Sequence, residues 1–153
     1  MTSLAPHLAA CLACGAANRV PHDKPASAAV CGRCGQALSL DKPVDVTDEQ
    51  FTLALEKSSG LVLVDVWAPW CGPCRAMAPQ FAAAAHHLAG RARLIKLNAD
   101  NSQIVRSLGV SGIPALLLFR DGRMIDRKAG LMNSDMIAAW VSEHSAASAK
   151  LAT

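Results

Sequence analysis

Residues 61–79, with the sequence LVLVDVWAPWCGPCRAMAP, carry the clearest structural pattern in this chain. Residues 61–67 are apolar and rich in β-branched valine apart from Asp65, which is typical of a strand buried on both faces of a sheet. A helix is predicted from about Cys71 to residue 88, with a kink at Pro79. The stretch therefore predicts a strand that leads directly into a helix beginning at a cysteine.

Cys71 and Cys74 are spaced for dithiol chemistry. The free N–H groups and the dipole at a helix start favour a thiolate, so we expect an exposed Cys71 with a lowered pKa. Cys74 lies one turn further on and can close a disulfide with Cys71, and Pro73 is tolerated because it stands in the first turn. The pair could instead be half of a metal site, but no fourth C-x-x-C pair exists to complete it.

Strand and helix patterns alternate outward from this stretch. An Asp121-Gly122 turn joins the last two predicted strands into a hairpin. The fold class is therefore α/β with a central mixed sheet flanked by helices. We assign residues 44–144 to this domain and expect residues 145–153 to form a flexible C-terminal tail. Strands are predicted at 43–46, 61–67, 93–97, 115–119 and 124–128, and helices at 47–57, 71–88, 102–107 and 133–143.

The other four cysteines lie in the first forty residues. Cys11, Cys14, Cys31 and Cys34 form two C-x-x-C pairs separated by a spacing typical of a structural zinc site. Four thiolates would complete a tetrahedron around one Zn²⁺ and leave no open position for catalysis, so His22 is not needed as a ligand. Two disulfides or four free thiols are the alternatives. Because so short a segment cannot build a core of its own, we favour a zinc ribbon over residues 1–40.

Composition limits the remaining function classes. The chain has 153 residues, a net charge of +3 without a basic cluster, and 4% aromatic residues, so we expect no nucleic-acid partner. Its apolar runs are far shorter than a membrane span, and no membrane partner is expected. The sequence Leu8-Ala9-Ala10-Cys11 resembles a lipoprotein cleavage site but lacks a preceding charged and apolar segment. We therefore expect a cytoplasmic protein, and a monomer.

The strand, the WCGPC sequence and the helix resemble the active-site stretch of the thioredoxin family. The likeness covers roughly residues 44–144 and includes Lys96 in IKLNAD, the sequence Gly112-Ile113-Pro114 before a strand, and Gly130. The N-terminal cysteine pairs are similar to those of the second bacterial thioredoxin type, which carries a zinc-binding extension. The resemblance implies a thioredoxin fold preceded by a zinc ribbon.

The resemblance also implies roles for individual residues. Cys71 would attack a substrate disulfide, Cys74 would resolve the mixed disulfide, and Asp65 and Lys96 would lie behind Cys74. Pro114 would be a cis-proline facing the disulfide. The substrate-binding residues would be Trp70, Gly72, Pro73, Gly112, Ile113, Pro114 and Gly130.

The implied activity is protein-disulfide reduction, recharged by an NADPH-dependent thioredoxin reductase, with disulfide-containing proteins as substrates. Gly72 and Pro73 favour the reducing direction over an oxidase or isomerase. A zinc-dependent binding or chaperone-like module is the alternative from another class. Asp65 is either a proton acceptor with a pKa raised by burial or a core acid, and Lys96 either tunes the site or is a strand-edge lysine.

Overall fold

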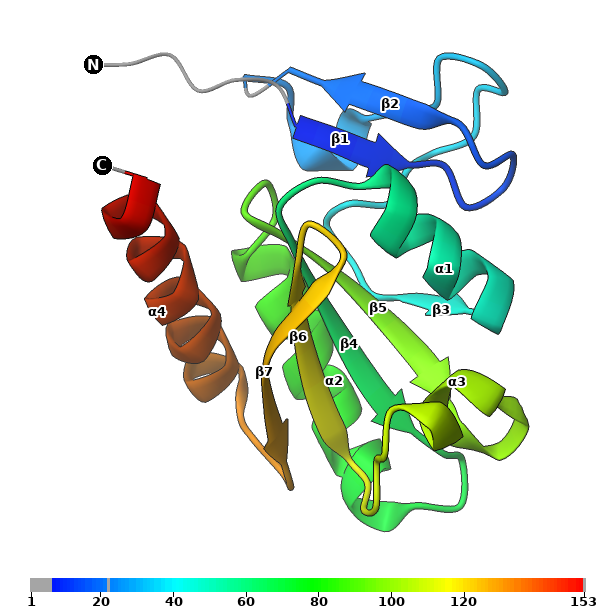
Figure 1. Cartoon of the computed structure of the whole chain (residues 1–153), viewed down its shortest axis with the longest axis vertical. Coiled ribbons are helices and arrows are strands. Elements are labelled where there is room, and N and C mark those ends of the chain that lie inside the picture. The colour runs from blue at the N-terminus through cyan, green and yellow to red at the C-terminus, as the bar shows by residue number, and fades with distance from the viewer. Residues whose placement is uncertain (1–6, 22, 153) are drawn as a thin grey trace.

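A computed structural model describes residues 7–21 and 23–152, and side chains as far as residue 145. A small N-terminal ribbon lies beside a larger α/β body, and Figure 1 shows the ribbon over helix α1 (Asp48–Lys57). The ribbon contains the hairpin of β1 (His7–Ala10) and β2 (Ala17–Val20), then the short 3-10 helix η1 (Ala26–Ala28). Its second cysteine loop is closed by one bridge between Val30 and Ala37.

The body is built on a five-stranded mixed sheet with the order β3-β5-β4-β6-β7. Strand β4 pairs in parallel with β5 and antiparallel with β6, so it lies at the centre, and six of its seven residues are buried. The mixed sheet and the doubly buried strand are therefore confirmed. The strands are β3 (Val44–Val46), β4 (Leu61–Trp67), β5 (Ala92–Asn98), β6 (Ala115–Arg120) and β7 (Arg123–Ala129).

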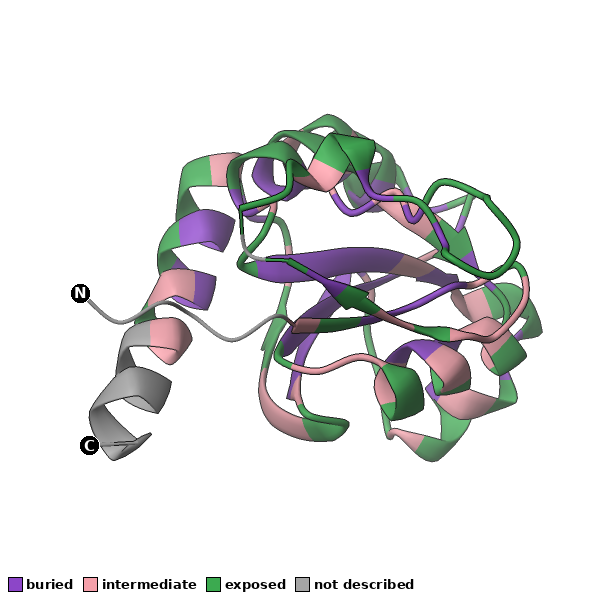
Figure 2. Ribbon diagram, turned by 90° about the horizontal axis from the view of Figure 1, so that it is seen from above, coloured by how far each residue is buried: buried purple, intermediate pink, exposed green. Residues whose placement is uncertain are grey.

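Helices cover both faces of the sheet, as Figure 2 shows by the buried strands between two exposed layers. Helices α2 (Gly72–His87) and α4 (Ser134–Ala152) pack on one face through Phe81 and Ile137, which join the core around Leu63. Helices α1 and α3 (Gln103–Ser107) pack on the other face, with the short helix η2 (Ala99–Asn101) before α3. The buried apolar side chains of the sheet are therefore divided between two separate cores.

Local sequence explains most of the element boundaries. Thr47 and Gln50 form a capping box at the start of α1, each side chain accepting a hydrogen bond from the other residue's amide. Asp121 and Gly122 both have positive φ in the two-residue turn between β6 and β7. The Asn133 side chain accepts from the Met136 amide at the start of α4.

The predicted end of the last helix is wrong. Helix α4 continues to Ala152 instead of ending near residue 143, so residues 145–152 are helical rather than a tail without regular structure. Residues 145–152 contain four alanines and no glycine or proline, and alanine has the highest intrinsic helix propensity. The small and polar composition that suggested a frayed end is equally compatible with a continuing helix. Thr153 lies outside the described residues.

Candidate functional site

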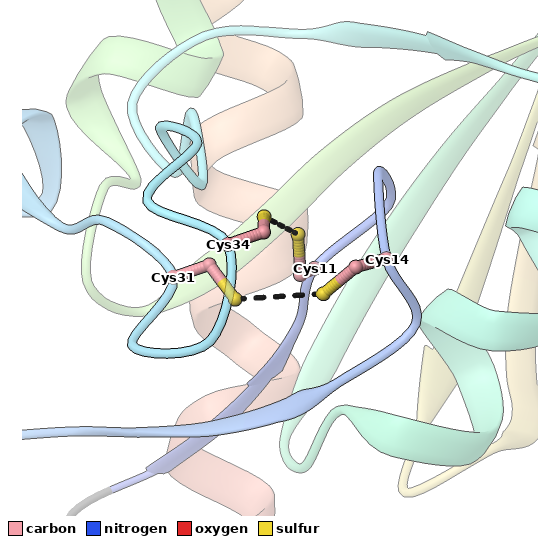
Figure 3. A group of neighbouring side chains, drawn as sticks. All are labelled: Cys11, Cys14, Cys31 and Cys34. Carbon is pink, nitrogen blue, oxygen red and sulfur yellow. Dashed lines mark hydrogen bonds between the residues drawn. The ribbon is translucent and has the colours of Figure 1, made fainter.

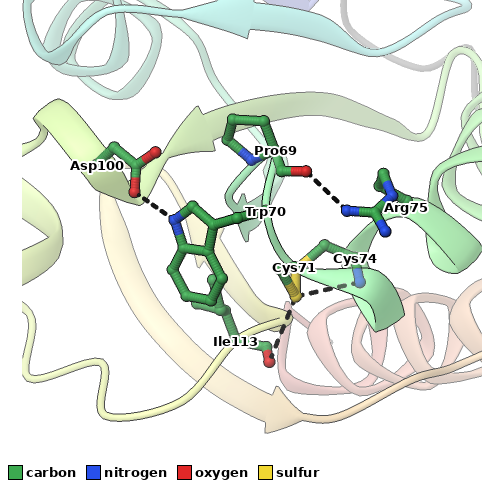
Figure 4. Close-up of a disulfide and its surroundings, with 7 residues drawn as sticks. All are labelled: Pro69, Trp70, Cys71, Cys74, Arg75, Asp100 and Ile113. Atoms are coloured by element: carbon green, nitrogen blue, oxygen red, sulfur yellow. Dashed lines mark hydrogen bonds between the residues drawn. A yellow bond between two sulfur atoms is a disulfide. The ribbon is translucent and has the colours of Figure 1, made fainter.

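The Cys71–Cys74 disulfide lies at the start of α2, as predicted. Cys71 caps the helix: its Sγ accepts a hydrogen bond of 3.2 Å from the Cys74 amide, and its carbonyl accepts from the Arg75 amide at 3.1 Å (Figure 4). A helix-start amide aimed at Sγ stabilises negative charge on that sulfur after the disulfide opens. The geometry therefore favours Cys71 over Cys74 as the thiolate.

Cys71 is not exposed in the disulfide form, which corrects the expectation from the sequence. It is 5% exposed and Cys74 is 2% exposed. The pair packs with Ala68 against Trp67 and Ile113, and the Ile113 carbonyl oxygen lies 3.9 Å from the Cys71 Sγ. Trp67 and Ala68 lie at the end of β4 and directly after it, close to Cys71 in the sequence, whereas Ile113 lies 42 positions later in the segment before β6.

The segment facing the disulfide contains the predicted cis peptide bond, between Ile113 and Pro114. The Pro114 carbonyl accepts a hydrogen bond of 2.9 Å from the Gly130 amide, so the residue after β7 joins the same surface. Gly130 has a φ of +96°, a conformation that glycine adopts without a steric penalty. Gly72 and Pro73, between the two cysteines, are exposed, and so is Gly112, which directly precedes Ile113.

Trp70 lies beside the disulfide and is 68% exposed, an unusual amount for tryptophan. Its indole Nε1 donates a hydrogen bond of 2.8 Å to the Asp100 Oδ1 (Figure 4). Asp100 belongs to η2 and was not identified from the sequence, where nothing distinguishes it from another surface acid. The bond holds the exposed ring in a fixed orientation next to Cys71.

Asp65 is completely buried in the centre of β4 and is aligned with Lys96 of β5. Neither carboxylate oxygen has a hydrogen-bond partner among the described residues. Burial raises the pKa of Asp65 to about 7, an effect that Lys96 reduces and Asp45 increases. Lys96 also places its Nζ 4.4 Å from the centre of the Trp67 ring. Because β5 lies between β3 and β4, Lys96 is not a sheet-edge lysine.

The four N-terminal cysteines form a compact cluster, shown in Figure 3. Their sulfurs all lie within 4.8 Å of one another, with 3.6 Å between Cys11 and Cys34 and 3.7 Å between Cys14 and Cys31. A tetrahedral zinc with Zn–S bonds of about 2.3 Å requires sulfurs about 3.8 Å apart. The donor set and its spacing therefore fit one tetrahedral, thiolate-binding metal ion, and the chain has a metal-binding cluster. His22 lies outside the described residues.

The two halves of the cluster have matching backbone turns. The Gly15 amide donates to the Cys11 carbonyl at 2.8 Å, and the Gly35 amide donates to the Cys31 carbonyl at 2.9 Å, both glycines having a φ near +80°. Hydrogen bonds from the Cys34 amide and the Asn18 side chain lower the pKa of Cys31 to about 6, against a smaller opposing effect of burial. At least one ligand is therefore an anion at neutral pH even before a metal binds.

Asn18 is a member of the metal site that was not identified from the sequence as a functional residue. Its Oδ1 accepts a hydrogen bond of 2.9 Å from the Gly32 amide, so the β1–β2 hairpin supports the loop that carries Cys31. The bond joins residues 14 positions apart, and only the folded ribbon brings them together.

No described helix is both long enough and apolar enough to cross a membrane.

Comparison with known proteins agrees with both parts of the structure. Residues 42–143 match the thioredoxin family model, and residues 10–36 match the model of the thioredoxin 2 N-terminal region. Thioredoxin C-3 of Corynebacterium nephridii is 34% identical over 134 residues, which cover 87% of this chain and 92% of that protein. Thioredoxin of Pseudomonas aeruginosa is 41% identical over 99 residues, which cover 64% of this chain and 92% of that protein.

Solved structures agree with the fold. A mutant thioredoxin from Halobacterium salinarum superposes with a TM-score of 0.59 and 29% identity, over 68% of this chain and 91% of that one. Chloroplastic thioredoxin z superposes with a TM-score of 0.64 and 24% identity, over 69% of this chain and 96% of that one, and supports the fold alone. With the disulfide at the start of α2 and the cis-proline before β6, these matches show that the chain is a thiol-disulfide oxidoreductase and belongs to the thioredoxin family.

Proposed function

We propose that this protein is a general protein-disulfide reductase. The observation that carries the proposal is the Cys71–Cys74 disulfide, held at a helix start where the Cys74 amide donates to the Cys71 Sγ. In the reduced protein, the Cys71 thiolate attacks one sulfur of a substrate disulfide and expels the other as a thiolate. Cys74 then loses its proton and attacks the Cys71 Sγ, which releases the second substrate thiol. Two electrons pass to the substrate and the protein disulfide is restored.

The reducing direction is supported by Gly72 and Pro73 between the cysteines, because the thioredoxin dithiol is more reducing than those of oxidising relatives. The chain has no glycine-rich fingerprint for binding a dinucleotide, so the reducing equivalents for its disulfide must come from a partner protein. We propose that this partner is an NADPH-dependent thioredoxin reductase, which would return the Cys71–Cys74 disulfide to the dithiol.

Substrate proteins would dock on the surface around the disulfide. An exposed indole fixed by Asp100 supplies apolar area at little entropic cost. We propose that the protein acts as a monomer. The proposed substrate-binding residues are Trp70, Gly72, Pro73, Gly112, Ile113, Pro114 and Gly130.

Asp65 is proposed as the proton acceptor for Cys74. An acid with a pKa of about 7 can take up and release a proton at the working pH, which suits a general base. Lys96, its neighbour across the β4–β5 pair, would limit the rise in that pKa. The catalytic role proposed for Asp65 is therefore to accept the proton of the Cys74 thiol.

For the N-terminal cluster we propose one structural Zn²⁺ held by Cys11, Cys14, Cys31 and Cys34. A bound ion would cross-link the two cysteine loops, and all four ligands come from the protein, which supports a structural role. Metal binding requires the four N-terminal cysteines to be reduced, and disulfide reduction requires Cys71 and Cys74 to be reduced. We therefore propose a reducing compartment, the cytoplasm.

Insulin reduction tests the proposed function. With NADPH and a bacterial thioredoxin reductase, the wild-type chain should reduce insulin, and Cys71→Ser should abolish turnover. A parallel assay supplies electrons from dithiothreitol. If only the dithiothreitol assay shows turnover, the proposed partner is wrong while the activity stands. If neither assay shows turnover above the rate without protein, the proposal of a disulfide reductase is refuted.

A further inference from the structure

Arg93 is a buried cation at the seam between the ribbon and the body. It belongs to β5, and it is 7% exposed. Its Nη1 donates a hydrogen bond of 2.6 Å to the Ala10 carbonyl, and its Nη2 donates one of 2.9 Å to the Leu38 carbonyl. Ala10 directly precedes the first metal ligand and Leu38 follows the last one by four residues. One guanidinium of the body therefore holds both ends of the metal-binding segment.

The positive charge of Arg93 has no carboxylate partner among the residues that the structure describes. Its Nε also has no hydrogen-bond partner there. Two carbonyl groups solvate a guanidinium only in part, and an uncompensated buried charge is strongly destabilising. The surrounding structure should therefore supply a negative charge from another source.

The cysteine cluster is that source. Cys11 is the residue after Ala10 and is itself buried, so the bond from the Arg93 Nη1 to the Ala10 carbonyl places the guanidinium next to the first ligand of the cluster. Four thiolates around a divalent cation carry a net charge of minus two, and outer groups that face such a cluster strongly affect its affinity for metal. We propose that Arg93 is the counter-ion of the metal–thiolate cluster and that this pairing couples metal retention to docking of the ribbon on the body.

The hydrogen bonds between β1 and the segment after α1 join neutral groups, unlike the two bonds that Arg93 donates. The Leu8 amide donates to the Ser59 Oγ at 2.8 Å, and the Ala10 amide donates to the Ser58 Oγ at 3.0 Å. The Ser59 amide donates to the Leu8 carbonyl at 2.9 Å. These bonds position β1 but do not respond to the charge of the cluster. They instead provide backbone reporters of docking, because the Leu8 and Ala10 amides exchange with solvent when the ribbon separates from the body.

Competition with a chelator tests the pairing on the full chain. The probe is Zn²⁺ alone, titrated against a chelator of known affinity, and Co²⁺ absorbance verifies a four-sulfur site. Arg93→Met should lower the affinity for metal by about 10-fold or more, the range typical of groups that support metal ligands. Arg93→Lys keeps the positive charge but loses the two-pronged guanidinium geometry, and its affinity for metal should stay within about 3-fold of the wild-type value.

The matched control is Arg106→Met. Arg106 is exposed on α3, which Figure 1 shows at the far end of the body from the ribbon, and its substitution should leave metal affinity unchanged. Hydrogen exchange of the loaded proteins should show faster exchange at Leu8 and Ala10 in Arg93→Met only. Reduction of a small-molecule disulfide by every variant verifies that the body is folded. If Arg93→Met does not fold, Arg93→Gln replaces it as the neutral variant.

Two results would overturn the proposal. Equal metal affinity in wild type and the neutral Arg93 variant would mean that the guanidinium does not compensate the cluster. Equal loss in Arg93→Lys and Arg93→Met, with the body folded in both, would mean that the site requires the shape of arginine rather than its charge.

Discussion

Replacing Asp65 with asparagine should stabilise the oxidised protein, and more so at high pH. Asp65 has a pKa of about 7 in the folded chain against 3.8 ordinarily. Because the folded state binds this proton more tightly than the unfolded state, the stability associated with the neutral acid is present below pH 3.8. It is lost as the pH rises through about 7. At 1.36 kcal/mol per unit, ionisation costs about 4 kcal/mol above pH 7.

Asparagine removes this cost but buries an amide without a ready partner. Both carboxylate oxygens lack hydrogen-bond partners among the described residues, and an unsatisfied polar group costs about 1–3 kcal/mol. The net gain for Asp65→Asn should therefore be about 1–3 kcal/mol at pH 8.5, equal to roughly 4–20 °C in melting temperature for a body of about 100 residues. At pH 4.5 the gain should disappear or reverse.

The assay is equilibrium unfolding in denaturant at pH steps from 4.5 to 8.5. The matched control is Asp45→Asn, because Asp45 of β3 is aligned with the same Lys96 but is exposed. It should change stability only slightly. Parallel stability curves for wild type and Asp65→Asn across this range would refute the raised pKa and the buried-charge argument together.

The same variant tests the catalytic role separately. If Asp65 accepts the Cys74 proton, Asp65→Asn should slow resolution of the mixed disulfide about 100-fold and leave the first attack by Cys71 nearly unchanged. Stopped-flow measurements of both steps between pH 6 and 8 provide the test. Wild-type rates for both steps would show that Asp65 is a core acid without a catalytic role.

Three further predictions concern the cysteines and the ribbon. Cys74→Ser should accumulate a mixed disulfide between Cys71 and the substrate, visible by mass spectrometry under non-reducing conditions. If this variant reduces its substrate catalytically and no mixed disulfide accumulates, the assigned order of attack is wrong. Freshly purified reduced protein should contain about one zinc per chain by elemental analysis. A preparation without metal would contradict the proposal that the four cysteines bind Zn²⁺. Deleting residues 1–40 should preserve disulfide exchange while lowering the melting temperature by roughly 5 °C or more, because Arg93 loses both acceptor carbonyls. A folded truncated chain without exchange activity would show that the ribbon is needed for catalysis.

The sequence predicted the features that depend on local pattern. Strand β4, the capping box at Thr47, the Asp121-Gly122 turn and the cysteine spacing each have their own sequence rule. The cis bond before Pro114 came from resemblance alone, since proline tolerates both isomers.

What could not be predicted depends on distant contacts. The burial of Cys71 is due to Ile113, 42 positions later, and the orientation of Trp70 is due to Asp100, 30 positions later. Arg93 looked like an ordinary charged residue at the start of a strand, and only the docked ribbon shows that it is buried. Leu40, at the end of the segment assigned to the ribbon, is likewise buried.

The bond between Arg93 and Ala10 also sets an order of assembly during synthesis. The partners lie 83 residues apart, which corresponds to about 4–17 s of translation at 5–20 residues per second. All four ligands of the cluster leave the ribosome before Arg93 is made. The cysteine cluster of the nascent chain is therefore available to bind metal before β5, which carries Arg93, has been made. The N-terminal segment is thus synthesised first but can dock on the body only after β5 has been made.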